Sequence, residues 1–193
     1  TSEQTNITDV LIIGAGIAGI SAAYHLKKYR PNSTFKILEG REEIGGTWSL
    51  FRYPGIRSDS DMQSFAFGFK PWTNKRVFGS AKMICDYLQE TVTENQIDEH
   101  IQFSHYMMSA EFSTSEGLWT VKVKHKDQKN LITFRSHFLL MRTGYYDYNT
   151  GYTPEFNGTE DFQGQIIHPQ HWPENLNYSG KKVVVIGSGA TAV

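Results

Sequence analysis

The sequence has 193 residues, with 39% hydrophobic residues and 19 Lys and Arg against 20 Asp and Glu, which describes an ordinary globular protein able to bury a core. The charges nearly cancel and no basic cluster is longer than two residues. Binding to nucleic acid or to an anionic membrane is therefore excluded, and small-molecule partners are expected. A single cysteine, Cys85, excludes an internal disulfide and a CxxC redox pair. We recognise no targeting or membrane segment, so we expect a cytoplasmic protein.

The first predicted elements are those of a βαβ unit. An apolar run ending at Ile13 predicts a buried strand, "GAGIAG" predicts a tight turn, and the following residues predict a helix that Pro31 ends. The stretch "STFKILE" predicts a second strand that ends at Glu39. Residues 40–61 are rich in glycine and aromatic residues and have no helical or strand period, so they predict a long irregular segment.

Further along the chain, Ser80 is expected to cap a helix that runs to about Asn95. Its buried face is formed by Ile84, Tyr87, Leu88 and Val92. Residues 101–138 predict an antiparallel meander of three short strands, "IQFSHYMMSAEF", "LWTVKVKHK" and "NLITFRS". The stretch "HFLLMRTG" then predicts a buried strand that rejoins the parallel sheet. Residues 144–180 read as a linker, and "VVVIGSGATAV" as a final strand with its own glycine turn. The fold class is thus α/β, a Rossmann-like parallel sheet with an inserted antiparallel β-meander and a second Rossmann unit only begun.

The motif "GAGIAG" predicts a dinucleotide site. Gly14 allows the tight turn after the strand, Gly16 lets the backbone approach a pyrophosphate, and Gly19 permits close packing of helix on strand. Glu39, twenty residues after Gly19, ends the next strand. Its carboxylate would accept hydrogen bonds from an adenosine ribose and repel a 2′-phosphate, which favours FAD or NAD over NADP. The alternative is that the glycines only form a tight strand-to-helix turn.

Two longer patterns narrow this choice. "GGTWSLFRYPGIRSD", residues 45–59, has the spacing [AG]GxWxxxx[FY]P[GM]xxxD, and "FQGQIIHPQHWP", residues 162–173, has the spacing FxGxxxHxxxW followed by Pro or Asp. Together they resemble the signatures of Baeyer–Villiger flavin monooxygenases, and the likeness covers nearly the whole chain from Val10 onward. The stretches "LFRYPGIRSDSDM" and "GQIIHPQHWPE" are most similar to the ethionamide-activating branch of that family.

This resemblance implies an enzyme that uses FAD, NADPH and dioxygen to insert one oxygen atom into a ketone and give an ester, with sulfoxidation or thioamide oxidation as further activities. It also implies that the chain is an N-terminal fragment lacking the C-terminal half of the same protein, and that the fragment alone is inactive. Residues 1–144 would be the first segment of an FAD-binding domain, residues 145–180 a linker, and residues 181–193 the opening strand and glycine turn of a truncated NADP-binding domain.

The resemblance assigns roles to individual residues. Asp59 would lie beside the flavin and position an arginine that this chain does not contain, and His168 would act indirectly, with Trp172, through the movement of the linker. The other expected contacts are to the cofactors. For FAD they are Gly14, Gly16, Gly19, Glu39, Gly46, Thr47, Trp48, Asp59 and the backbone of Met107, and for NADPH they are Gly187, Gly189 and Ala192.

Alternatives remain open at several of these positions. One alternative is a heteroatom-oxidising flavin monooxygenase, although such an enzyme would usually have Tyr in place of Trp172. A second is a non-catalytic FAD-binding module. A disulfide oxidoreductase is excluded because Cys85 has no second cysteine with which to form a redox pair. Asp59 could be a turn or cap residue and His168 a structural one. The chain also departs from the family at Phe65, where the family usually has Tyr.

A second departure is Arg142, which stands where the family usually has a small residue. A buried and unpaired cation there would be costly, so we expect its side chain to find an acid, a phosphate or solvent. The histidines other than His168 have no spacing typical of metal ligands, and no metal site is expected.

Overall fold

The structure is a computed structural model and describes residues 7–193. The chain divides into two compact units. Unit 1 consists of the described residues up to Thr47 together with Ile84–Gly144. Unit 2 consists of Trp48–Met83 and Tyr145–Val193. The signature at residues 45–59 and the fingerprint at residues 162–173 therefore fall largely in the same unit, although a hundred residues of sequence separate them.

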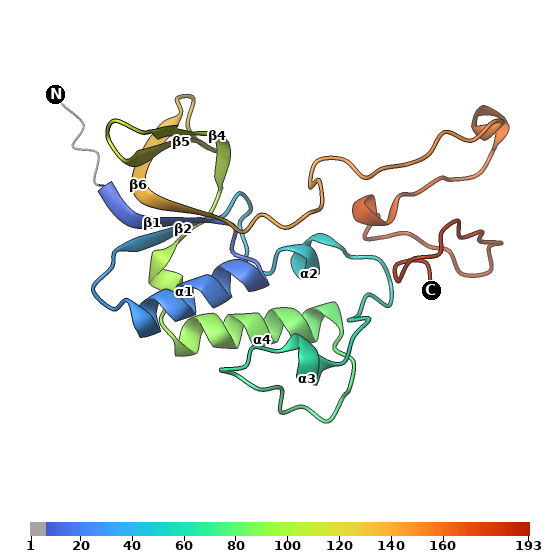
Figure 1. The fold of residues 1–193 in the computed structure, drawn as a ribbon. Coiled ribbons are helices and arrows are strands. Elements are labelled where there is room, and N and C mark those ends of the chain that lie inside the picture. Colours follow the sequence, from blue (N-terminus) through green and yellow to red (C-terminus); the bar gives the residue numbers. More distant parts are fainter. Residues whose placement is uncertain (1–6) are drawn as a thin grey trace. The chain divides into compact units, whose positions relative to one another are not determined.

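Unit 1 is built on one six-stranded sheet with the order β3-β2-β1-β6-β5-β4. Its strands are β1 (Ile7–Ile13), β2 (Phe35–Leu38), β3 (Ile101–Gln102), β4 (His105–Ser113), β5 (Leu118–His125) and β6 (Ile132–Met141). β1 pairs in parallel with both β2 and β6, and β2 pairs in parallel with β3. β4, β5 and β6 pair antiparallel. The predicted Rossmann-like parallel sheet with an inserted meander is confirmed (Figure 1).

The main helices of the chain are α1 (Ile17–Tyr29) and α4 (Ala81–Glu94), and Figure 1 shows both on the same side of β1 and β2. α1 ends two residues before Pro31, as predicted, because proline has no N–H to continue the hydrogen-bond ladder. α4 begins after Ser80, whose hydroxyl accepts the backbone N–H of Met83 at 3.3 Å. All four of its predicted core residues are buried, namely Ile84, Tyr87, Leu88 and Val92.

The core lies on both faces of β1. Leu11 and Ile13 point to one face, where they pack with Leu38, Val121 and Val123 under the meander. Ile12 points to the other face, toward α1, and is fully buried. This explains the continuous apolar run of β1, since a strand covered on both sides has no solvent-facing positions.

The meander differs from its prediction in three details. The expected strand "IQFSHYMMSAEF" is two strands, because the backbone turns at Ser104 with a φ of 58° and only β4 joins the meander, while β3 pairs with β2. Conversely, "NLITFRS" and "HFLLM" form the single strand β6, which serves β5 and β1 together. A β-bulge interrupts the register between Met107 and Ser109.

The predicted strand at residues 183–186 is wrong for this structure. Val183, Val184, Val185 and Ile186 form no strand and are all more than 60% exposed. A strand needs a neighbour for its N–H and C=O groups, and the described residues of unit 2 contain no other strand. Strand-forming residues alone do not create a strand here.

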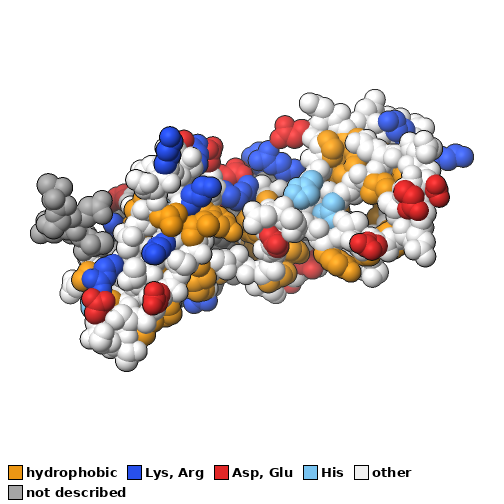
Figure 2. All heavy atoms as spheres, turned by 90° about the horizontal axis from the view of Figure 1, so that it is seen from above, with side chains coloured by type: hydrophobic (Ala, Val, Ile, Leu, Met, Phe, Trp, Pro, Cys, Tyr) orange, Lys and Arg blue, Asp and Glu red, His pale blue; other side chains and the backbone are white. Residues whose placement is uncertain are grey.

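Unit 2 consists of short elements joined by turns. Its regular elements are α2 (Thr47–Leu50, beginning in unit 1), α3 (Met62–Phe65), η2 (Thr159–Asp161) and η3 (Pro169–His171). Asp61 caps α3 by accepting the backbone N–H of Ser64 at 2.8 Å. Figure 2 shows acidic and basic side chains interspersed on one face of the molecule, in keeping with the near-zero net charge.

Candidate functional site

The glycine turn between β1 and α1 is shaped by its two outer glycines. Gly14 has a φ of 103°, which L side chains rarely adopt, and the backbone carbonyl of Arg142 lies against it. A Cβ at Gly19 would overlap the carbonyl oxygen of Gly14. These two positions therefore need glycine for the fold itself, one for the turn and one for the packing of α1 on β1.

Gly16 is different, because the protein leaves room for a side chain there. A Cβ at Gly16 would meet only the backbone of Gly46, at 3.6 Å, which is ordinary van der Waals contact. Gly16 is also the N-cap of α1, with no side-chain cap and no acidic residue in the first turn. A helix N-terminus has N–H groups without intrahelical partners, and beside a glycine that leaves room for a close neighbour it is the arrangement that binds phosphate groups.

Glu39 lies beside this turn and is buried, at 7% exposure. Its Oε2 accepts the backbone N–H of Ala15 at 2.7 Å, and its Oε1 accepts the N–H of Arg41 at 2.9 Å. Each carboxylate oxygen can accept more than one hydrogen bond, so the group keeps capacity for the hydroxyls of a ribose. The residues fit the ADP part of a dinucleotide, since a helix N-terminus and a buried carboxylate follow the neighbouring strands β1 and β2.

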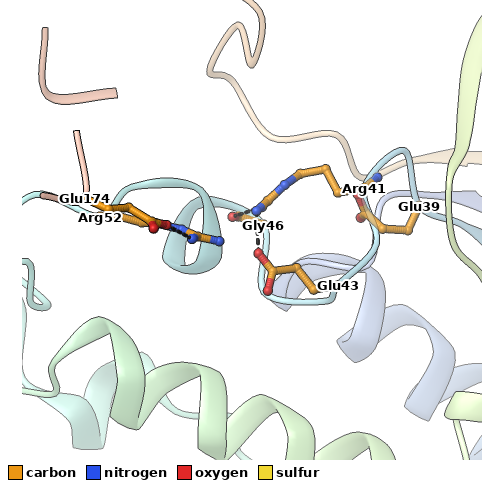
Figure 3. Close-up of polar contacts among 6 residues, drawn as sticks. All are labelled: Glu39, Arg41, Glu43, Gly46, Arg52 and Glu174. Carbon is orange, nitrogen blue, oxygen red and sulfur yellow. Dashed lines mark hydrogen bonds and ion pairs between the residues drawn. The ribbon is translucent and has the colours of Figure 1, made fainter. Parts of the chain in front are cut away.

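Arg41 is a site residue that the sequence motifs did not reveal. Its guanidinium donates to the carbonyl of Gly46 at 3.2 Å and pairs with Glu43 at 2.6 Å (Figure 3). This cation thus links the segment after Glu39 to the glycine pair Gly45–Gly46, both of which have positive φ. The sequence "EGREEIGG" could have indicated it, because Arg41 is the single basic residue within an acidic run that begins at Glu39.

Met107 lies on β4 at the bulge, and its half-buried side chain packs against the core under the meander. Met108 is the extra residue of the bulge and is exposed. Met107 is still paired with Val123, and the bulge that follows it re-aims the backbone groups on that side. Arg142 is exposed. Of the three environments expected for its side chain, the structure gives it solvent. Its backbone N–H continues the sheet by donating to Ile13 at 2.8 Å.

In unit 2, Trp48 and Phe65 meet edge to face, with ring centroids 5.5 Å apart. Asp59 is exposed, and its carboxylate makes no hydrogen bond to the residues that the structure describes. The cap of the next helix is Asp61 instead. The neighbouring Ser58 is buried and fixed to Gly79 by two hydrogen bonds, of 2.8 and 3.0 Å. Asp59 is thus an exposed residue next to a well-anchored point of the backbone.

The fingerprint at residues 162–173 folds onto its own unit. The His168 ring lies against Gly151, where a Cβ would overlap it, and its Nδ1 accepts the N–H of Gln170 at 3.2 Å. Gln170 is buried and donates to the carbonyl of Asp147 at 2.7 Å. Trp172 contacts Tyr178 with ring centroids 6.0 Å apart. These contacts close residues 147–170 into a loop.

The second glycine motif forms a turn without a flanking strand or helix. Ala192 donates its backbone N–H to Gly189 at 2.8 Å, and Gly187 lies next to the side chain of Ala192. The structure thus brings together Gly14, Gly16, Gly19, Glu39 and Gly46 in unit 1, but it does not build a strand-turn-helix around residues 187–192.

Two further properties concern residues 7–193. No three His, Cys, Asp or Glu side chains among them gather in a group that could hold a metal ion. None of their helices combines the length and the apolar character needed to cross a membrane.

Comparison with curated proteins shows close relatives. The chain is 54% identical to a protein named "Probable FAD-binding monooxygenase AlmA" from Acinetobacter, over 96% of this chain and 37% of that protein. It is 54% identical to "FAD-containing monooxygenase EthA" of Mycolicibacterium smegmatis and 52% identical to that of Mycobacterium tuberculosis, in each case over 98% of this chain and 38% of the relative. The chain therefore spans less than two fifths of the length of these relatives.

Solved structures agree with this likeness. The open crystal structure of cyclohexanone monooxygenase superposes with a TM-score of 0.82 at 29% identity, over 97% of this chain and 36% of that one. A structure titled "Oxidized steroid monooxygenase bound to NADP" gives a TM-score of 0.78 at 28% identity, over 95% of this chain and 35% of that one. Both likenesses run through the meander and the fingerprint segments, not the glycine turn alone.

The sequence pattern of the family described as "Pyridine nucleotide-disulphide oxidoreductase" matches residues 11–193. This match covers both glycine motifs, the signature at residues 45–59 and the fingerprint at residues 162–173. The chain belongs to that family, and its resemblance to the Baeyer–Villiger flavin monooxygenases and their EthA branch is confirmed.

Proposed function

We propose that the full-length protein is an FAD- and NADPH-dependent monooxygenase of Baeyer–Villiger type, which inserts one oxygen atom of dioxygen into a ketone to give an ester. The structural observation that carries the cofactor part of this proposal is the room for a close neighbour at Gly16 beside the buried carboxylate of Glu39. Bound there, FAD would supply the activation of dioxygen, and the protein would supply binding, orientation and charge. The names of the relatives, which are FAD-containing monooxygenases, support the same assignment.

In unit 1, the N–H groups at the start of α1 would hold the FAD pyrophosphate between Gly14, Gly16 and Gly19. Glu39 would bind the adenosine ribose, and the backbone of Met107 would meet the adenine. Gly46 and Thr47 would continue along the cofactor. Residues 1–144 would then be the first segment of the FAD-binding domain.

In unit 2, Trp48 would lie along the flavin and Asp59 beside it. The exposed carboxylate of Asp59 suits a group that pairs with a cation supplied by the rest of the protein. That cation would be the expected arginine, whose charge would stabilise the developing anion of the reaction. His168 would act indirectly within the linker, residues 145–180. Gly187, Gly189 and Ala192 would begin the NADPH site in residues 181–193, completed by later parts of the chain.

The family description includes disulphide oxidoreductases, but this chain offers only Cys85, half-buried on α4. A thiol-disulfide reaction of that class needs two cysteines within bonding distance. Trp172 at the end of the fingerprint favours ketone oxidation over a purely heteroatom-oxidising enzyme. Sulfides and thioamides are proposed as further substrates.

The test is an assay of the purified full-length protein. We expect one FAD per polypeptide by absorbance, and NADPH oxidation that rises on addition of cyclic or linear ketones, with one atom of 18O2 found in the ester by mass spectrometry. A flavin-free protein would contradict the cofactor assignment. A flavoprotein that oxygenates only sulfides and amines would contradict the ketone chemistry. The 193-residue chain assayed in parallel is expected to show no NADPH-dependent oxygenation.

A further inference from the structure

Three consecutive residues of the signature at residues 45–59 contact three separate parts of residues 145–193. Phe51 meets Tyr146 edge to face, with ring centroids 5.1 Å apart. Arg52 pairs with Glu174, and the hydroxyl of Tyr53 donates to that of Thr191 at 3.4 Å. We call Phe51, Arg52 and Tyr53 the docking triplet. Its partners mark the beginning of the linker, the residue after the fingerprint and the second glycine motif.

The first contact is apolar. Phe51 is buried and also packs against Tyr53, at a centroid distance of 6.1 Å. Tyr146 in turn contacts Tyr145, with the two rings tilted by 34° and their centroids 4.7 Å apart. Aromatic pairs with such centroid distances stabilise a fixed geometry beyond their buried area. The chain leaving β6 is thus held to the signature segment as soon as it enters unit 2.

The second contact is an ion pair. The Arg52 Nη1 and Glu174 Oε1 atoms are 2.8 Å apart, with side chains 57% and 72% exposed (Figure 3). Exposed pairs are weak and screened by salt. The ion pair between Arg52 and Glu174 can therefore form and break readily, whereas the contact made by the buried Phe51 is expected to persist.

The docking triplet is connected to Asp59 by a short stretch of backbone. Only a short segment that begins with a Pro54–Gly55 turn, with Gly55 at a φ of 79°, separates the two, and Ser58 fixes the far side. Partial desolvation raises the pKa of the Tyr146 phenol above its usual range, and Tyr145, Tyr53 and the Asp59 carboxylate add to this shift. The partner of Phe51 therefore lies within electrostatic reach of the Asp59 carboxylate.

We infer that the docking triplet couples the position of residues 145–193 to that of Asp59, with Arg52 and Glu174 as positioning residues of the monooxygenase. The ion pair of Arg52 with Glu174 forms only when the segment after the fingerprint lies against the docking triplet. When that segment moves, the short turn after Tyr53 shifts and moves Asp59 with it. The role in catalysis rests on the proposed function, but the contact itself does not.

A charge exchange in the full-length protein separates these two statements. The variants are Arg52→Glu, Glu174→Arg, the double variant that restores the pair in reverse, and Glu155→Arg as a control on an exposed glutamate of the same segment. Hydrogen–deuterium exchange of residues 172–178 reports the contact without any need for activity. The ratio of oxygenated product to NADPH consumed reports its effect on the reaction.

We expect each single variant to raise exchange of residues 172–178 by about fivefold at low salt and to lower the product-to-NADPH ratio. The double variant should restore both quantities, and Glu155→Arg should change neither. Unchanged exchange in the single variants would overturn the contact. Altered exchange with an unaltered product ratio would overturn the positioning role. If even the wild-type protein consumes no NADPH, the proposed function fails while the exchange measurement still decides the contact.

Discussion

The carboxylate of Glu39 accepts the backbone N–H of Ala15 at 2.7 Å, so the acidic end of β2 holds the glycine turn that follows β1. The same carboxylate is proposed to bind the ribose of FAD. The contact of Glu39 with Ala15 is present without cofactor. Its proposed contact with the ribose would need FAD to be bound. Substitutions can separate the two.

We expect Glu39→Ala to lower the free energy of unfolding by about 1–3 kcal/mol, because it leaves the buried N–H of Ala15 without its charged acceptor. Urea unfolding without flavin measures this loss. Glu39→Lys should in addition reduce flavin content severely when compared at equal folded fractions. A lysine variant that retains its full flavin content would remove Glu39 from the cofactor site.

The glycine turn gives a matched pair of variants. Gly19→Ala should unfold the protein or lower its stability strongly, because its Cβ would overlap the carbonyl of Gly14. Gly16→Ala should fold with nearly wild-type stability, because its Cβ has room in the protein, but it should lose flavin, whose pyrophosphate needs that space. Far-ultraviolet circular dichroism and flavin absorbance distinguish these outcomes. A folded Gly16→Ala variant with normal flavin would show that no phosphate approaches there.

Asp59→Ala in the full-length enzyme should lower the rate of oxygenation by roughly 100-fold while flavin content stays close to normal. The reason is that a misaligned arginine would lose charge stabilisation, whereas the adenine end of FAD would still be held by the proposed contacts of unit 1. Asp59→Asn, which keeps the shape and removes the charge, should behave similarly. Wild-type turnover in either variant would reject the role of Asp59.

His168→Ala should mainly reduce the fraction of NADPH that ends in oxygenated product, because the ring closes the linker loop against Gly151. Hydrogen peroxide release alongside NADPH oxidation measures this fraction. His137, which is exposed on β6 in unit 1 and outside the fingerprint, provides the control His137→Ala. If the His168 variant remains folded, flavin-loaded and fully coupled, the ring contact is incidental.

Ser136→Ala should be neutral or stabilising by about 1 kcal/mol. The Ser136 hydroxyl is fully buried in β6 and has no hydrogen-bond partner among the residues that the structure describes. Replacing an unsatisfied hydroxyl by hydrogen removes its desolvation cost. A fall of more than about 1 kcal/mol in the urea unfolding free energy would indicate that the hydroxyl is satisfied.

Local patterns predicted most of the elements in unit 1. The apolar run of β1, the stop at Pro31 and the buried face of α4 are all encoded within a few residues, so periodicity and capping found them. Glu39 and the three glycines were found in the same way, because the motif spacing reflects one strand-turn-helix unit.

The errors concern pairing between distant segments. No feature within "IQFSHYMMSAEF" predicts that Ile101 pairs with β2 while His105 pairs with β5. These pairings depend on where the partner strands lie in the folded sheet. The strand propensity of Val183–Ile186 likewise has no effect where no neighbouring strand exists. The docking triplet was missed for the same reason, because its contacts join residues more than ninety positions apart.

β6 is a single strand that pairs with two different strands. Its first half keeps register with β5 and its second half with β1, and the two pairings overlap at Arg135 and Ser136. Its last hydrogen bond, from Arg142 to Ile13, leads directly into the glycine turn. A slip of one residue would turn every side chain to the opposite face and displace the turn as well. Changes in chain length should therefore be tolerated in the exposed turn at residues 126–131 but rejected between Ser136 and Arg142.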